Sequence, residues 1–205
     1  MNTVSPFKTA DQKKAERAAK RDAVLLAAVR MFNERGFHAT SLDDVAASLG
    51  ISKRTIYHYL ANKDQVLLEC VTIGLNQLLE AAAEASREPG TGRDRLAKFL
   101  RRYAEINMED FGRCVIRTGE ETLSPASIPQ YRQLKRGIDN AMRERIAEAV
   151  ADGSIAPVDV KIAAFTLAGA LNWPARWHNP DGPMTREEIS AAMVDLLMQG
   201  LLPSA

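Results

Sequence analysis

The chain has 205 residues, of which 46% are hydrophobic and 26% charged, a composition typical of a globular protein with a sizeable apolar core. The formal charge of +1 is unevenly spread: residues 1–64 carry 11 Lys and Arg against 7 Asp and Glu, whereas residues 65–205 carry 16 against 19. The basic N-terminal part suits a phosphate-bearing partner, although a surplus of this size is also common on solvated surfaces.

The two cysteines, Cys70 and Cys114, are far apart in the sequence and far from the three histidines, which argues against a disulfide framework and a zinc site. We therefore expect no metal and no cofactor. The N-terminus lacks the apolar core of a secretory signal, and the longest uncharged apolar stretch, around residues 163–175, is too short to cross a bilayer. The sequence predicts a cytoplasmic protein that has no membrane partner.

Apolar residues recur at intervals of three and four along the whole chain, and almost no alternating pattern occurs, which predicts an all-α fold. Gly36 is expected to end the first helix in the left-handed conformation. Ser41 and Asp44 form a capping-box pattern at the start of the second helix. A long helix is expected to begin after Asn62 and to continue to about Ser86.

The turn-rich segment 88–93 separates that long helix from a fifth one. A short sixth element is expected from about Arg113 to Thr122, followed by a helix that ends near residues 152–153. Two further apolar stripes predict helices over residues 158 to about 177 and over residues 185–202. These last two helices are apolar enough to need a partner surface, either in the same chain or in a second copy.

The spacing around Gly50 is that of a helix-turn-helix. The motif needs a small residue where its helices touch, here Ala46, and a glycine that turns the chain between them. Ser52 is expected to cap the second helix, whose outward side chains suit the major groove of DNA. These side chains are Lys53, Arg54, Thr55, Tyr57, His58 and Tyr59. For the aromatic residues the alternative is packing in the core, and a bare pattern of this kind also occurs in proteins that do not bind DNA.

The run from Arg21 to Leu68, which includes LLAAVRMFNERGFHATSLDDVAASLGISKRTIYHYLANKDQVL, resembles the N-terminal domain of the TetR family of bacterial regulators. It departs from the family pattern at Arg54, where Gly or Ala is frequent, and at Leu60, where Phe is usual. The resemblance implies a three-helix DNA-binding domain, joined by a long fourth helix to a helical bundle that binds a ligand and dimerises. We expect a flexible arm over residues 1–16 and domains over residues 17–64 and 65–205.

The resemblance also implies how the first domain binds DNA. Thr40, Ser41 and Lys63 are expected to contact backbone phosphates, and the helix that follows Ser52 is expected to enter the groove. Arg54 is the residue expected to read a base, because a guanidinium fork matches guanine. The basic residues near the N-terminus, which extend from the arm into this domain, either reach DNA or are simply solvated, and the pattern leaves both open. They are Lys13, Lys14, Arg17, Lys20 and Arg21.

In the second domain, the resemblance implies a homodimer through the last two helices and an effector pocket among the middle ones. The segment LNWPARWHNPDGPMT, Leu171 to Thr185, is similar to a subgroup of the family whose members often respond to acyl-CoA thioesters. Trp173 and Trp177 either cap the pocket or anchor the dimer interface, and anchoring is the favoured interpretation. His178 has no second ligand in view and is expected to be a satisfied or exposed histidine.

An acyl-CoA needs an apolar pocket for its acyl chain and cations for its phosphates. The expected apolar lining is Leu100, Tyr103, Ile106, Phe111, Ile116, Met142, Phe165 and Leu171. The expected cations are Arg113, Arg117 and Arg176, each of which could instead belong to a surface or intersubunit ion pair.

With this resemblance, the sequence predicts a ligand-responsive transcriptional regulator. The family's usual mode implies a repressor that a small hydrophobic effector, such as an acyl-CoA from lipid, sterol or aromatic catabolism, releases from a palindromic operator, although the residues themselves leave repression and activation open. The alternative effector is a hydrophobic drug-like compound, as for a regulator of efflux or stress genes. An architectural DNA-binding protein would lack a cavity. An enzyme is not expected, because no nucleophile–base pair, glycine-rich phosphate loop or pair of metal ligands occurs at useful spacing.

Overall fold

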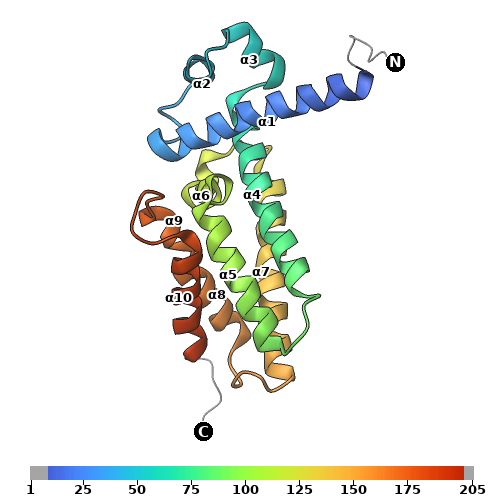
Figure 1. The fold of residues 1–205 in the computed structure, drawn as a ribbon, viewed down its shortest axis with the longest axis vertical. Coiled ribbons are helices and arrows are strands. Elements are labelled where there is room, and N and C mark those ends of the chain that lie inside the picture. Colours follow the sequence, from blue (N-terminus) through green and yellow to red (C-terminus); the bar gives the residue numbers. More distant parts are fainter. Residues whose placement is uncertain (1–8, 201–205) are drawn as a thin grey trace, which may run out of the picture. The chain divides into compact units, whose positions relative to one another are not determined.

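The computed structural model describes residues 9–200, and its contacts divide the chain into two compact units, one ending at Leu67 and one beginning at Leu68 (Figure 1). Within residues 9–200 the secondary structure is entirely helical, which confirms the predicted all-α fold. The helices are α1 (Ala10–Arg35), α2 (Leu42–Ser48), α3 (Lys53–Tyr59), α4 (Lys63–Ala85), α5 (Gly92–Met108), α6 (Asp110–Arg117), the 3-10 turn η1 (Glu120–Thr122), α7 (Ile128–Ala151), α8 (Val160–Asn172), α9 (Pro174–Trp177) and α10 (Arg186–Gln199).

Helix α1 begins at Ala10, within the segment 1–16 that was expected to be a flexible arm. The cause is a capping box: the Thr9 hydroxyl accepts from the Gln12 amide at 3.2 Å, and the Gln12 side chain accepts from the Thr9 amide at 2.9 Å. Residues 1–8, the rest of the expected arm, lie outside the described residues. The basic side chains that follow Thr9 therefore project from a helix.

Two turns connect the helices of the first unit. The predicted capping box at α2 is present. The Asp44 amide donates to the Ser41 hydroxyl at 3.1 Å, and the Ser41 amide donates to the Asp44 carboxylate at 2.9 Å. Gly50 has φ 64°, the left-handed turn expected between α2 and α3. Gly36 differs from expectation: its φ of 84° is combined with ψ 155°, which is outside the left-handed helical region and is accessible mainly to glycine. Leu49 is 37% exposed, because it lies at the C-cap of α2 rather than on the inner face of that helix.

Helix α5 is central in the second unit and contacts α6, α7, α8, α9 and α10 (Figure 1). Its inward stripe, which includes Leu96, Phe99 and Leu100, is fully buried. Helix α4 packs closely on α6 at Gly74, where a β-carbon would lie 2.6 Å from the carbonyl oxygen of Phe111. Close packing of this kind leaves little room for the helices around α5 to shift independently.

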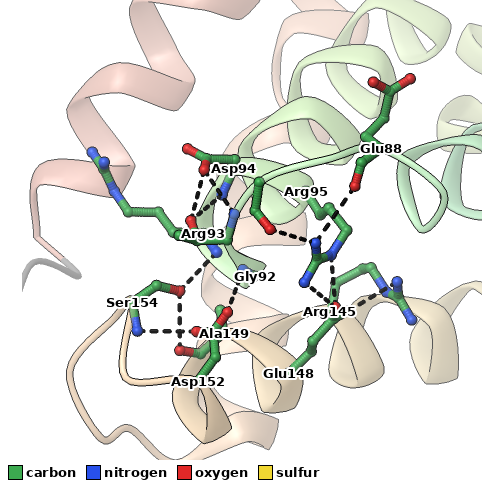
Figure 2. Close-up of polar contacts among 12 residues, drawn as sticks. Glu88, Gly92, Arg93, Asp94, Arg95, Arg145, Glu148, Ala149, Asp152 and Ser154 are labelled. Atoms are coloured by element: carbon green, nitrogen blue, oxygen red, sulfur yellow. Dashed lines mark hydrogen bonds and ion pairs between the residues drawn. The ribbon is translucent and has the colours of Figure 1, made fainter.

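The N-terminal end of α5 is fastened to the chain that follows α7 (Figure 2). The Gly92 amide donates to the Asp152 carboxylate at 2.5 Å, and the Arg93 amide donates to the Ser154 hydroxyl at 2.9 Å. Both amides belong to the first turn of α5, where no intrahelical acceptor exists. The side chains after α7 thus satisfy these donors and fix the two helices to each other.

Helix α4 is long and apolar enough to cross a membrane if only its length and composition are considered. However, 56% of its most apolar window is buried inside the protein, where Val71, Leu75 and Leu78 contribute to the core. Burial against other helices accounts for this hydrophobicity. The longest uncharged apolar stretch, around residues 163–175, lies instead in α8 and α9.

Candidate functional site

Helix α3 presents most of its side chains to solvent. Ile56 is completely buried and packs the helix onto the first unit, and the Ser52 hydroxyl caps it by accepting from the Thr55 amide at 3.1 Å. Lys53, Arg54, Tyr57 and His58 are exposed, whereas Thr55 and Tyr59 are partly buried. Tyr57 exposes 48% of its surface, which excludes the alternative that it packs in the core.

The two cations at the start of α3 have different surroundings. Lys53 forms an ion pair of 2.7 Å with Asp43 of α2, and the hydrogen bond within this pair raises the pKa of Lys53. Both partners are well exposed, so water and salt weaken the pair. Among residues 9–200, no side chain or carbonyl accepts a hydrogen bond from Arg54. Its guanidinium is available to an external partner.

Lys63 and Thr40 are held within the first unit. The Lys63 ammonium donates to the carbonyl oxygens of Phe37 at 2.8 Å and of Thr40 at 2.9 Å, and it lies 4.2 Å from the centre of the Phe37 ring. Thr40 is buried, and its hydroxyl donates to the Gly36 carbonyl at 2.9 Å. The Thr40 hydroxyl therefore faces inward, so a phosphate contact by this residue would not come from its side chain. Lys63 keeps one N–H for an external acceptor.

A shallow hollow of about 400 Å³ lies in the first unit and is bordered by Thr40 and Lys63, among other residues. Its lining includes Ser41, Tyr57 and Lys63, which come from the starts of α2 and α4 and from the exposed face of α3. The Ser41 residue is exposed, with its hydroxyl bonded to the Asp44 carboxylate at 2.6 Å. The Tyr57 phenol and the Lys63 ammonium are donors of the kind that bind DNA phosphates, whereas the Asp44 carboxylate, which also borders the hollow, accepts a hydrogen bond from the Ser41 hydroxyl.

The second unit contains a cavity of about 460 Å³, which is in the range of small-molecule sites. Its walls come from α4, α5, α6, α7, α8 and α9. The apolar lining consists of Leu75, Leu78, Val115, Ile116, Ile138, Met142, Ala164, Phe165, Ala168, Gly169 and Trp173. The polar lining consists of Tyr103, Thr118, Lys135, Asp139, Asn172 and Arg176.

The cavity includes only part of the lining expected from the sequence. The expected residues that border it are Tyr103, Ile116, Met142, Phe165 and Arg176. Leu100, Ile106 and Leu171 are instead core residues with at most 1% of their surface exposed. Phe111 and Arg117 also lie outside the cavity lining. The α4 residues, and the α7 residues other than Met142, were missed, because an apolar stripe predicts burial but does not show which buried side chains border a void.

Arg113, the remaining expected ligand residue outside the lining, connects α6 to the chain after α9. Its Nη2 contacts Nδ1 of His178 at 3.1 Å and donates to the carbonyl oxygens of His178 and Met108, both at 3.2 Å. Burial lowers the pKa of Arg113 and also that of His178, where the Arg113 charge adds to the effect. These contacts give Arg113 a structural role, and they show His178 as the satisfied histidine that the sequence predicted.

Three polar side chains form a small network beside the cavity. The Tyr103 hydroxyl donates to Oδ1 of Asn172 at 2.9 Å, and Nδ2 of Asn107 donates to the same oxygen at 3.0 Å. Burial raises the pKa of Tyr103, so its hydroxyl stays protonated and can donate. Tyr103 and Asn172 border the cavity, and Asn107 is completely buried behind them.

Large apolar side chains are exposed on the C-terminal helices. Each of them exposes half or more of its surface: Ile162, Phe165, Trp173, Trp177 and Leu196. They come from α8, α9 and α10. Exposed apolar surface of this extent is typical of an interaction site.

Comparison with known proteins gives matches along most of the chain. Residues 24–70 match the family described as bacterial regulatory proteins, tetR family, and residues 89–201 match the tetracyclin repressor-like C-terminal domain. The HTH-type transcriptional repressor KstR2 of Mycolicibacterium smegmatis is 26% identical over 196 residues, which cover 91% of this chain and 93% of the relative.

Two solved structures are similar over nearly their whole length. The TetR-family regulator PfmR from Thermus thermophilus superposes with a TM-score of 0.79 and 31% identity, covering 88% of this chain and 99% of its own. AibR, solved in complex with isovaleryl coenzyme A and operator DNA, superposes with a TM-score of 0.75 and 25% identity, covering 86% and 96%. With the helix-turn-helix and the cavity of the second unit, these matches show that the chain belongs to the TetR family of DNA-binding transcriptional regulators and is not an enzyme.

Proposed function

We propose that the protein is a dimeric repressor that leaves its operator when a CoA thioester of a hydrophobic acid enters the cavity of the second unit. The observation that carries the effector class is the lining of this cavity, which combines apolar walls with two exposed cations, Lys135 and Arg176. A protein that acts on chromosomal DNA in this way works in the cytoplasm.

The DNA-binding surface in this proposal is the exposed face of α3 together with the hollow beside it. Arg54 is the candidate for reading a base, because it is exposed and has no acceptor in the described part of the chain. Ser52, Lys53, Thr55, Tyr57, His58 and Tyr59 supply the neighbouring contacts. Ser41 and Lys63 contact phosphates at the hollow, whereas the Thr40 side chain is too deeply buried to do so.

Dimerisation through α8 and α10 would cover the apolar side chains that these helices expose. Ile162 and Leu196 are 62% and 71% exposed, more than is usual for aliphatic side chains on a monomer surface. A two-fold dimer presents two copies of α3 and so matches a near-palindromic operator. One copy alone would read too few base pairs for specificity in a genome.

The cavity suits both parts of a CoA thioester. Its apolar walls accommodate a hydrophobic acyl group, and its volume of about 460 Å³ limits the size of that group. Lys135 and Arg176 are exposed and border the cavity, as expected for cations at its mouth that bind phosphates. Asp139 also borders the cavity, one turn after Lys135 on α7, and would repel a phosphate there. Arg176, on α9, is therefore the more important of the two cations in this proposal. The similarity to AibR, which was solved with isovaleryl coenzyme A, supports this class of ligand.

The test is a mobility-shift assay on the DNA that flanks the protein's own gene, with acyl-CoA thioesters, the matching free acids and hydrophobic drug-like compounds as effectors. We expect the thioesters to release DNA and the free acids to be much weaker. Arg176→Ala should reduce release by the thioester, whereas Arg136→Ala, an exposed residue of α7 outside the cavity lining, should not. Equal release by the free acid, with Arg176→Ala unimpaired, would instead favour the drug-like effector, which needs no cations.

A further inference from the structure

The side-chain amide of Asn172 is held in one orientation at the edge of the cavity. Its oxygen accepts two hydrogen bonds, one from Tyr103 at 2.9 Å and one from Asn107 at 3.0 Å. An amide oxygen with two such partners is directed toward them, so the amide nitrogen must point to the other side. In the described part of the chain no acceptor receives a hydrogen bond from that nitrogen.

The reverse orientation of Asn172 is less favourable. It would place the Asn172 amide hydrogens against the Tyr103 oxygen, and the Tyr103 hydroxyl proton would then lose its acceptor inside a buried site. Asn107 would have to turn as well, which would leave its own amide hydrogens unpaired. In the observed arrangement the only cost at Asn107 is an oxygen without a donor. A buried carbonyl oxygen without a hydrogen-bond partner costs less free energy than a buried N–H or O–H without one.

We propose that Asn172 recognises the carbonyl oxygen of the effector's acyl group, by donating a hydrogen bond from the amide that Tyr103 and Asn107 hold in place. Asn172 borders the cavity, and the same cavity has apolar walls that include Leu78 and Met142. A neutral carbonyl is the acceptor that such surroundings favour, because a carboxylate would have to give up its hydration. This inference rests on the proposed function, since it assigns a residue to one group of the proposed ligand.

The experiment compares two ligands that differ only at the carbonyl. One is an acyl-CoA, chosen as the tightest binder among butanoyl-, octanoyl- and dodecanoyl-CoA. The other is the S-alkyl-CoA of equal length, in which a CH2 group replaces the carbonyl. Both keep the CoA phosphates and the apolar chain, so their affinity ratio isolates the carbonyl. Binding is followed by calorimetry and by tryptophan fluorescence, because Trp173 borders the cavity.

The wild-type protein is expected to bind the acyl-CoA about tenfold more tightly than the S-alkyl-CoA, the effect of one well-placed hydrogen bond. Asn172→Asp keeps the oxygen that Tyr103 and Asn107 need but removes the donor, so the ratio should fall to about one. Asn140→Asp, the same exchange at an exposed position of α7, should keep the wild-type ratio. Tyr103→Phe leaves Asn172 freer to turn and should reduce the ratio in part.

Three results would contradict the proposal, and they are distinguishable. A wild-type ratio of about one overturns the role of the carbonyl, whether or not the Asn172 variant folds. An unchanged ratio in a folded Asn172→Asp protein overturns the assignment to Asn172, while the CoA proposal remains. Failure of every CoA compound to bind or to release DNA overturns the proposed effector itself, and this inference with it.

Discussion

Gly92 of α5 lies directly against the backbone of Ala149 of α7, since a β-carbon on Gly92 would be 2.5 Å from the Ala149 Cα. The same glycine donates its amide to Asp152, as Figure 2 shows. Gly92→Ala must therefore separate the two helices and weaken that hydrogen bond. We expect the free energy of unfolding to fall by about 1–3 kcal/mol, the usual cost of an overpacked site, as measured by urea denaturation.

The matched control for this change is Ala147→Ser, which also adds one heavy atom but at an exposed position of α7. Surface changes of this kind alter stability by about 0.5 kcal/mol or less. If both variants unfold at the same urea concentration as the wild type, the close contact between α5 and α7 does not constrain the fold.

The pH dependence of stability is expected to reflect His178. Burial, and then the Arg113 charge, lower the pKa of His178 from its ordinary 6.5. The unfolded chain therefore takes up this proton more readily than the native protein does. The stability that neutral His178 contributes to the folded protein is fully present above the unfolded pKa of 6.5. It is lost as the pH falls through the lower pKa that His178 has in the folded protein. The melting temperature should accordingly decrease when the pH is lowered through this range.

His178→Gln tests the cause, because its side-chain oxygen can accept from Arg113 but does not titrate. This variant should lose less stability than the wild type over the same pH interval. His58→Gln, at an exposed position of α3, should keep the wild-type profile. A His178→Gln profile that parallels the wild type throughout would show that other groups cause the acid sensitivity.

The parts of the fold that the sequence predicts well are those fixed by neighbouring residues. The Ser41–Asp44 capping box and the turn at Gly50 depend on residues a few positions apart, and both are found in the structure. The start of α1 has the same kind of signal in Thr9 and Gln12, but the polar composition around it suggested an arm. A local hydrogen-bond pattern was a better guide there than composition.

The cavity could be predicted only in part, because its lining depends on how distant helices pack. Leu100 and Leu78 both belong to apolar stripes and both are buried, yet only Leu78 borders the void. Likewise, Arg113 and Arg176 are equivalent in the sequence pattern, but Arg113 is held by His178. The exposed face of α3 was easier to predict, since it follows from the spacing around Ile56 within a single short helix.

The two neighbouring cations of α3 should differ in their effect on DNA binding. Arg54→Ala should cost about 1–3 kcal/mol on the preferred operator and relax the preference at one base pair in each half-site. Lys53→Ala should weaken all DNA sequences alike, and modestly, because Asp43 already pairs with this ammonium. Titration of operator variants at several salt concentrations measures both effects.

Lys63→Ala is expected to combine a binding defect with a folding defect. It removes a cation from the hollow and also releases the carbonyl groups of Phe37 and Thr40. Binding to every DNA sequence should weaken, with a flatter salt dependence by about one counterion per subunit, and the melting temperature should fall. Sequence-dependent losses for Lys63→Ala would contradict its assignment to a phosphate, and uniform losses for Arg54→Ala would contradict the assignment of base reading to Arg54.

The last prediction concerns the exposed apolar faces of α8 and α10. If two copies of the chain bury these faces against each other, a carboxylate placed there loses hydration without gaining a partner, so Ile162→Glu and Leu196→Glu should each shift the protein from dimer to monomer at micromolar concentration. Light scattering measures the mass, and operator affinity should fall in parallel because a monomer engages one half-site. Met184→Glu is the control, since Met184 is 45% exposed but lies in the loop before α10, and this variant should remain dimeric. A wild-type monomer, or Ile162 and Leu196 variants that remain dimers with full operator affinity, would place the dimer interface on another surface.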